Sequence, residues 1–269
     1  MAFPDRQTLD LHHGRVSYRQ AGSGPDLVLL HGLAGNSRTW EEQFAAFSGR
    51  WRVTAWDAPG YGESDTVEPT VDAYAAALAA LVDALELPRF VLLGHSMGGV
   101  VAGRFAGTYP ERLRALALSC TLLGRRQAPG TPLSEPYLAR LRELETLPAR
   151  EYGANRAKSM AAPGCAPEIL ERLTGIAAET RREGLESAMR LIAVADNSAA
   201  LASLILPVLV LTGQEDRTVT KEVSGDLLAA LAGGPAQVKT KELPGVGHAP
   251  YLEDTAAYNS ALQAFLDDL

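Results

Sequence analysis

The sequence has few cysteines, few aromatic residues and no long apolar run. Its 269 residues include only Cys120 and Cys165 as cysteines, so we expect free thiols and neither a disulfide framework nor a metal site. No uncharged apolar run reaches the ~18 residues of a membrane span. Asp5 and Arg6 also stand where a secretory signal needs an apolar stretch. These absences predict a cytoplasmic protein that makes no membrane contact.

Basic charge is also scarce. Lys and Arg number 25 against 32 Asp and Glu, which gives a formal net charge of −7. Without a basic patch, nucleic acid is not an expected partner. The apolar share of 46% is that of a folded chain rather than a disordered one. This length allows either one large α/β domain or a core domain with an insertion.

Short runs rich in Val and Leu alternate with helix-like segments, a pattern typical of a mostly parallel sheet with helices on both faces. Strands are predicted at 26–31, 52–57, 89–94, 113–120, 207–213 and 237–243, after an antiparallel hairpin at 8–20. Helices are predicted at 71–85, 97–109 and 251–269. The predicted fold class is therefore α/β.

Residues 121–200 interrupt this alternation. They lie between two predicted strands, are rich in Arg and Glu, and are broken by several prolines. We expect a helical cap (lid) over the carboxyl ends of the strands, where open parallel sheets hold their ligands. The core then consists of residues 1–120 and 201–269. The alternative is a group of peripheral helices without a role in binding.

The segment GHSMG at 94–98 follows a predicted strand and precedes a predicted helix. In this context G-x-S-x-G holds a serine on a strained turn, and its glycines let strand and helix approach closely. Ser96 is therefore the predicted nucleophile, and the alternative is a turn without a catalytic purpose. Acyl transfer also needs two N–H donors for the developing oxyanion. We expect them from Met97, directly after the serine, and from Leu33 in HGLAG after the first parallel strand.

A serine nucleophile needs a base and a group that orients the base. Of the five histidines, His248 lies in a loop after the last predicted strand, where it can project over the sheet. His95 adjoins Ser96, but we expect its side chain to point away. For the acid, Glu215 and Asp216 both suit by type, and their spacing from the strand end favours Asp216.

Five segments carry a resemblance that spans nearly the whole chain: HGLAGNSRTW at 31–40, DAPGYGESD at 57–65, GHSMGG at 94–99, TGQEDRTV at 212–219 and GVGHAPYLED at 245–254. The sequence resembles the α/β-hydrolase superfamily in its capped, cofactor-independent branch, which has the chain order serine, acid, histidine. The resemblance implies Ser96, Asp216 and His248 as a catalytic triad, with the amides of Leu33 and Met97 as the oxyanion hole. It implies no cofactor and a helical lid at 121–200.

The serine also narrows the reaction. Haloalkane dehalogenases and epoxide hydrolases resemble this chain but carry aspartate at the nucleophile position. The C–C bond hydrolases of aromatic degradation have a longer Gly- and Pro-containing loop after the first His-Gly, so they are disfavoured. The sequence is most similar in character to small carboxylesterases and to enol-lactonases of the 3-oxoadipate type. We therefore expect a carboxylic ester hydrolase, with a lactone as the alternative substrate, in a monomer or homodimer.

Three questions stay open at this stage. The same fold also serves as a small-molecule receptor with slow residual hydrolysis, because fold alone does not define function. One arginine of the predicted lid could clamp a substrate carboxylate, although most such arginines lie on solvated helix faces. Asp57 is expected to hold the turn that follows it rather than to take part in catalysis.

Overall fold

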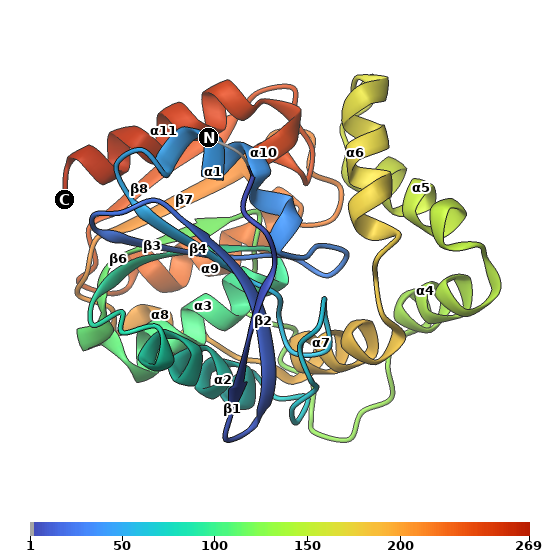
Figure 1. The fold of residues 1–269 in the computed structure, drawn as a ribbon, viewed down its shortest axis with the longest axis horizontal. Helices are drawn as coiled ribbons and strands as arrows, with labels where there is room; N and C mark the ends of the chain where they lie inside the picture. The colour runs from blue at the N-terminus through green and yellow to red at the C-terminus, as the bar shows by residue number, and fades with distance from the viewer. Residues whose placement is uncertain (1–2) are drawn as a thin grey trace.

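Eight strands form one sheet in the computed structural model, which describes residues 3–269 (Figure 1). The strands are β1 (Gln7–Leu11), β2 (Gly14–Ala21), β3 (Asp26–Leu30), β4 (Arg52–Trp56), β5 (Phe90–His95), β6 (Leu113–Ser119), β7 (Val208–Gly213) and β8 (Val238–Leu243). Their order is β1-β2-β4-β3-β5-β6-β7-β8. The hairpin β1–β2 is antiparallel, and β2 pairs antiparallel with β4. The six strands β3 to β8 are mutually parallel. The predicted fold class and the predicted strands are confirmed.

Each central strand supplies apolar side chains to both faces of the sheet. In β3, Val28 and Leu30 join one buried cluster, whereas Leu27 and Leu29 join the other, because successive side chains of a strand point to opposite faces. The first face is covered by α2 (Val71–Ala84), α3 (Met97–Thr108), α8 (Ser198–Ala202) and α9 (Lys221–Ala232). The second is covered by α1 (Glu41–Phe47) and α11 (Thr255–Asp267) (Figure 1). This burial on both faces explains the continuous apolar runs in the sequence.

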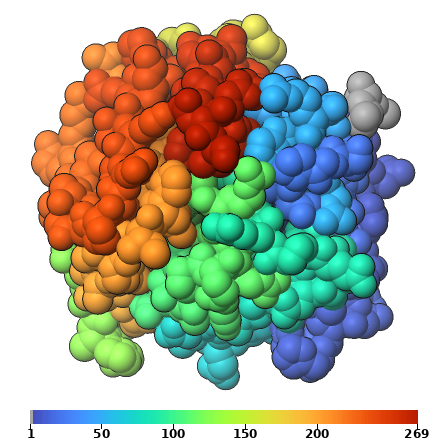
Figure 2. All heavy atoms as spheres, turned by 90° about the vertical axis from the view of Figure 1, so that its left-hand side faces the viewer, coloured from blue at the N-terminus to red at the C-terminus, as the bar shows by residue number. Residues whose placement is uncertain are grey.

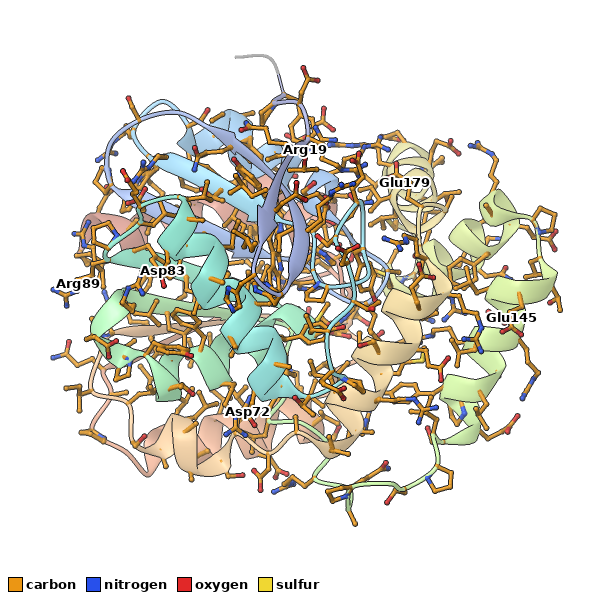
Figure 3. The ribbon with its side chains drawn as sticks, turned by 60° about the horizontal axis from the view of Figure 1, so that its bottom comes forward. Arg19, Asp72, Asp83, Arg89, Glu145 and Glu179 are labelled. Carbon is orange, nitrogen blue, oxygen red and sulfur yellow. The ribbon has the colours of Figure 1, made fainter. Side chains whose placement is uncertain are left out.

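Four of the five helices between β6 and β7 stand together at one side of the sheet (Figure 1). They are α4 (Glu135–Thr146), α5 (Ala149–Met160), α6 (Pro167–Ala177) and α7 (Arg182–Val194). Tyr152, Leu185 and Met189 are buried in a small core of their own. Glu145 of α4 pairs with Arg182 of α7 (Figure 3). These contacts hold the helices as one group.

The C-terminal segment departs from its prediction. The single helix expected at 251–269 is two helices, α10 (Pro250–Glu253) and α11, separated at Asp254. The Asp254 side chain accepts a hydrogen bond from the Ala257 amide (2.9 Å) and so caps α11. Its φ of −138° and ψ of 74° lie outside the helical region, as expected for an N-cap residue. The expectation of one continuous helix was therefore wrong at this point.

On the face of the molecule turned away from α4–α7, the C-terminal helix lies beside residues near position 50 (Figure 2). There Arg50 Nη2 lies 3.3 Å from Asp267 Oδ1. Short 3₁₀ helices occur at η1 (Ser37–Trp40) and η2 (Pro110–Arg112). Within residues 3–269, no helix is both long and apolar enough to cross a membrane.

Candidate active site

Ser96 lies on a strained turn between β5 and α3. Its φ of 53° falls in the left-handed region, which a residue with a side chain adopts only when its surroundings enforce it. Here the Ser96 amide donates to Ser119 O (2.9 Å), and the Thr121 hydroxyl donates to Ser96 O (2.6 Å). Bonds from β6 and the residues after it therefore fix the turn that carries the serine.

Two glycines make the turn sterically feasible. A Cβ on Gly94 would lie 2.7 Å from Gly99 Cα, and one on Gly98 would lie 2.7 Å from His31 O. Both separations are shorter than side-chain carbons tolerate, so the closeness of β5, α3 and the end of β3 depends on glycine at these positions. The reason expected for the glycines of GHSMG is confirmed.

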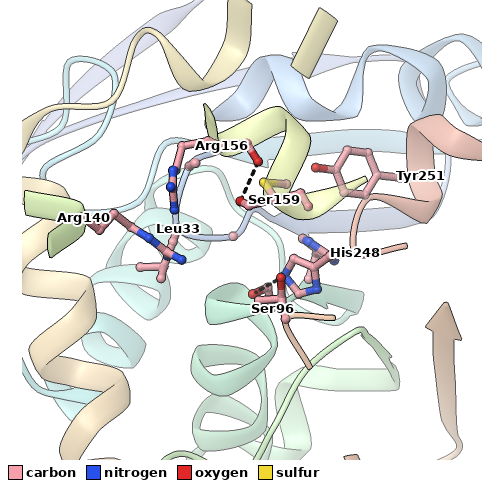
Figure 4. Close-up of a pocket in the computed structure, with 13 residues that line it drawn as sticks. Leu33, Ser96, Arg140, Arg156, Ser159, His248 and Tyr251 are labelled. Atoms are coloured by element: carbon pink, nitrogen blue, oxygen red, sulfur yellow. Dashed lines mark hydrogen bonds between the residues drawn. The ribbon is translucent and has the colours of Figure 1, made fainter. Parts of the chain in front are cut away.

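The structure brings together the three side chains predicted from the sequence, those of Ser96, Asp216 and His248. His248 Nε2 lies 3.0 Å from Ser96 Oγ (Figure 4). On the other side of the ring, His248 Nδ1 lies 2.8 Å from Asp216 Oδ2. All three residues are buried, with 7%, 3% and 9% of Ser96, His248 and Asp216 exposed. Glu215, the alternative acid, is exposed to solvent. The choice of Asp216 over Glu215 agrees with these positions.

The hydrogen bonds around Asp216 define the proton positions on His248. Asp216 Oδ1 accepts from the amides of Thr218 (2.8 Å) and Val219 (2.9 Å), which leaves Oδ2 to accept from His248 Nδ1–H. Burial by itself would raise the pKa of Asp216, but the hydrogen bond and charge of His248, together with these two amides, lower it overall. Asp216 is therefore ionised near neutral pH and accepts from His248 Nδ1, so that Nε2 of His248 faces Ser96 Oγ.

Glu253 orients the loop that carries His248, a role that the sequence interpretation missed. Its carboxylate accepts hydrogen bonds from the amides of Gly247 (3.0 Å), Ala249 (3.0 Å) and Ala162 (2.7 Å). The His248 amide itself donates to Met160 O (2.8 Å). The only signal in the sequence is the acidic end of GVGHAPYLED, which does not show where the carboxylate points.

The loop after β3 presents the expected amide donors. His31 Nε2 accepts from the Ala58 amide (3.0 Å), and its Nδ1 then donates to Gly32 O (2.8 Å). Burial is the main cause that lowers the pKa of His31, so the ring stays neutral and suits this pair of bonds. Among residues 3–269, neither the Leu33 amide nor the Met97 amide has a hydrogen-bond acceptor. Both amides are therefore available to a ligand.

The Asp57 carboxylate accepts hydrogen bonds that fix the start of η1, next to this loop. Its Oδ1 accepts from the Ser37 amide (2.7 Å) and its Oδ2 from the Ser17 hydroxyl (2.6 Å), while Arg6 Nε lies 3.1 Å away. Asp57 is fully buried and does not line the pocket. These bonds run to β2, to Arg6 and to the start of η1 rather than to the 59–62 turn that Asp57 was expected to hold. At that turn the Asp57 side chain packs against Gly62, where an added Cβ would lie 2.3 Å from Asp57 Oδ2.

His95 does not point away as expected. Its ring centroid lies 4.9 Å from the ring of His248 and 4.9 Å from that of Tyr251, and the residue lines the pocket. Burial, followed by the nearby His248 and His31, holds the pKa of His95 well below its usual range. The expectation failed because a left-handed turn at Ser96 does not determine the direction of the preceding side chain. The neutral His95 ring therefore forms part of the pocket lining.

A pocket opens above Ser96 and His248, and its empty space of about 440 Å³ includes the open solvent at its mouth. Its walls come from the loop after β3 and from α4 and α5, and they include Leu33, Arg140, Arg156, Ser159 and Tyr251 (Figure 4).

One group of potential metal ligands lies within the described residues. Cys120, Asp216 and His248 bring ligand atoms within 4.8 Å of one another. However, burial raises the pKa of the Cys120 thiol well above its usual value, and Asp216 and His248 are already joined by their 2.8 Å hydrogen bond. A cation there would require a thiolate and the loss of that bond, so this donor set fits a hydrogen-bonded chain better than a metal centre.

Comparison with known proteins agrees with this fold. The solved enol-lactonase from Burkholderia xenovorans LB400 superposes with a TM-score of 0.84 at 24% identity, covering 97% of this chain and 100% of its own, which shows the fold. Residues 27–261 match the sequence profile of the alpha/beta hydrolase family. The chain belongs to this family.

Two further relatives are similar over their whole length. The chain is 29% identical to 3-oxoadipate enol-lactonase 2 of Acinetobacter baylyi, over 98% of this chain and 97% of the relative. It is 28% identical to a thermophilic esterase from Thermogutta terrifontis solved with malate bound, with a TM-score of 0.82 and 98% of each chain covered.

Proposed function

We propose that this protein is a serine hydrolase that cleaves a carboxylic ester of a small molecule through Ser96, His248 and Asp216. The observation that carries the proposal is the continuous chain of hydrogen bonds from Asp216 through His248 to Ser96 at the base of a pocket. The family membership and the esterase among the solved structures support it.

The reaction begins when Ser96 Oγ attacks the ester carbonyl carbon and its proton passes to His248 Nε2. The carbonyl oxygen becomes an oxyanion that accepts hydrogen bonds from the amides of Leu33 and Met97. When the tetrahedral species collapses, the proton on His248 Nε2 passes to the leaving oxygen, which departs as an alcohol. The acyl group remains on Ser96.

Water completes the cycle. His248 Nε2 takes a proton from a water molecule as that water attacks the acyl carbon, and collapse of the second tetrahedral species returns the proton to Ser96 Oγ and releases the acid. Asp216, ionised because its pKa is lowered, stabilises the imidazolium at both stages. A lactone follows the same steps, except that its leaving oxygen stays attached to the acyl group. The enol-lactonase relative of A. baylyi favours this second substrate class.

Residues 121–200 serve as the lid in this proposal, over a core of 1–120 and 201–269. Support comes from Arg140, Arg156 and Ser159, which line the pocket from α4 and α5, and from Met160, whose carbonyl accepts the His248 amide. Peripheral helices without a role in binding would have no side chains at the serine.

Steady-state hydrolysis of p-nitrophenyl acetate and butyrate tests the function. Wild-type protein should turn over many times, and Ser96→Ala should lower kcat by about 10⁶-fold. Ser203→Ala is the matched control because Ser203 is exposed after α8, and it should keep the wild-type rate. Circular dichroism checks that both variants fold.

Two results would contradict the proposal. Near-normal activity of Ser96→Ala would require another nucleophile. A single burst of product followed by silence in the wild type would instead indicate a small-molecule receptor that retains slow hydrolysis.

A further inference from the structure

The arginines between residues 121 and 200 are almost all neutralised by carboxylates. Within the described chain, ion pairs to Asp or Glu are made by Arg126, Arg142, Arg150, Arg156, Arg172, Arg181, Arg182 and Arg190. The two others are Arg125, which is exposed to water, and Arg140, which is partly buried.

Arg140 has no partner although it is partly buried. It projects from α4 into the pocket (Figure 4), its Nε is inaccessible to solvent, and no hydrogen bond or ion pair joins its side chain to any residue of 3–269. Burial and the nearby Arg156 both lower the pKa of Arg140, yet a guanidinium keeps its charge in proteins. A charge that is partly shielded from water and has no partner is costly, so an anionic group of a ligand would be stabilised beside Arg140.

Arg156 approaches the same space from α5. Glu143 Oε2 accepts from its Nη2 (2.9 Å), and its guanidinium lies 5.7 Å from the centre of the Tyr152 ring. The Arg156 Nε is buried without a partner. Both guanidinium groups point toward the space beside Leu33 (Figure 4). Glu143 thus offsets one of two adjacent positive charges.

The rest of the pocket offers no compensation. No Asp or Glu is among the residues that line it, although the whole protein carries a net charge of −7. A planar guanidinium matches a carboxylate through two parallel N–H···O bonds. A carboxylate carried by a small substrate would complement the two guanidinium groups.

We propose that Arg140, with Arg156 beside it, binds a carboxylate of the substrate, so that the preferred substrate is an ester or lactone that also carries an ionised carboxyl group. This inference rests on the proposed function and adds the substrate class. The arginines hold the far end of the substrate while its carbonyl lies at Ser96. They are binding residues and do not touch the reacting bond.

Matched ester pairs test the assignment. We compare monomethyl succinate with methyl butyrate, and monomethyl adipate with methyl hexanoate, by pH-stat titration at neutral pH. Within each pair the acyl chain has the same length and only the distal carboxylate differs. For wild-type protein the kcat/KM ratio of acid ester to neutral ester should exceed 10 in at least one pair.

Variants at Arg140 locate the cause. Arg140→Gln should lower that ratio by about 100-fold, the scale expected for loss of a buried charged partner, and Arg140→Lys should lower it less because the charge remains without the planar fork. Arg142→Gln is the control, since Arg142 lies on the same helix, is exposed and pairs with Glu135. It should leave the ratio unchanged.

A measurement on wild-type protein covers the case in which Arg140→Gln does not fold. Adipate should inhibit methyl hexanoate hydrolysis competitively at concentrations where hexanamide and inorganic phosphate do not. Equal inhibition by phosphate would overturn the assignment to a carboxylate.

The two proposals fail separately. Ratios below 10 in both pairs, or a ratio that Arg140→Gln does not change, would overturn the carboxylate site while ester hydrolysis stands. Absence of any turnover of methyl butyrate and p-nitrophenyl butyrate would overturn the proposed function itself.

Discussion

The exchange of Asp216 for Asn tests the proposed acid with a minimal change in shape. In the wild-type structure, Oδ1 accepts from the amides of Thr218 and Val219, and Oδ2 accepts from His248 Nδ1. Asn can keep its Oδ1 on the two amides, which places its NH₂ group toward His248. The loop is therefore expected to keep its structure while the bond to the histidine reverses.

This reversal determines the magnitude. When the amide NH₂ donates to Nδ1, the imidazole proton must move to Nε2, which lies 3.0 Å from Ser96 Oγ. Nε2 then can no longer accept the proton of the serine, and no carboxylate stabilises an imidazolium. A wrong tautomer in a serine triad lowers kcat by roughly 10⁴-fold, or about 5.5 kcal/mol of transition-state stabilisation.

Steady-state rates with p-nitrophenyl butyrate measure this loss, and Glu215→Gln is the matched control. Glu215 is the neighbouring residue, also loses one carboxylate in the exchange, and is exposed, so its rate should stay within twofold of wild type. The reasoning is refuted if Asp216→Asn keeps more than a tenth of wild-type kcat, or if Glu215→Gln is the more damaging change.

Two further predictions concern stability. Gly98→Ala should lower the free energy of unfolding by roughly 2 kcal/mol or more through overpacking, because its Cβ would meet His31 O at 2.7 Å. Gly225→Ala inside α9 should instead raise the free energy of unfolding by up to about 1 kcal/mol, because nothing lies within 4 Å of the added Cβ. Urea denaturation compares the two variants, and equal effects would contradict the packing argument. The lowered pKa of Asp216 means that its carboxylate contributes stability above the pKa of the unfolded chain, about 3.9, and that this contribution is lost as pH falls through the lower folded value. The unfolding free energy of wild type relative to Asp216→Asn should thus be constant above about pH 5 and fall below pH 4, and parallel curves between pH 3 and 6 would speak against a lowered pKa.

The strands and the serine turn could be predicted because their signals are local. Runs such as 26–30 and 90–94 are apolar throughout since both faces of the sheet are covered, and Gly94 and Gly98 mark the one place where helix and strand approach this closely. The interruption at Asp254 was missed because its capping bond to Ala257 competes with a continuous helical pattern.

Features that depend on three-dimensional neighbours could not be predicted in this way. The direction of the His95 ring follows from its packing against His248 and Tyr251. The contribution of Glu253 requires knowing that residue 162 lies beside residue 247. The sequence likewise lists ten arginines between 121 and 200 without showing that Arg140 alone is both shielded and unpaired.

The bonds from residues 160–162 to the histidine loop limit how this molecule can be re-engineered. Met160 O accepts the His248 amide, the Ala162 amide donates to Glu253, and a Cβ on Gly247 would lie 2.6 Å from Met160 O. A chimera that exchanges residues 121–200 for the helices of a relative would remove the bonds that Met160 and Ala162 make to the loop carrying His248. Transplants that retain 160–162 should preserve the rate of proton transfer and change only which molecules enter.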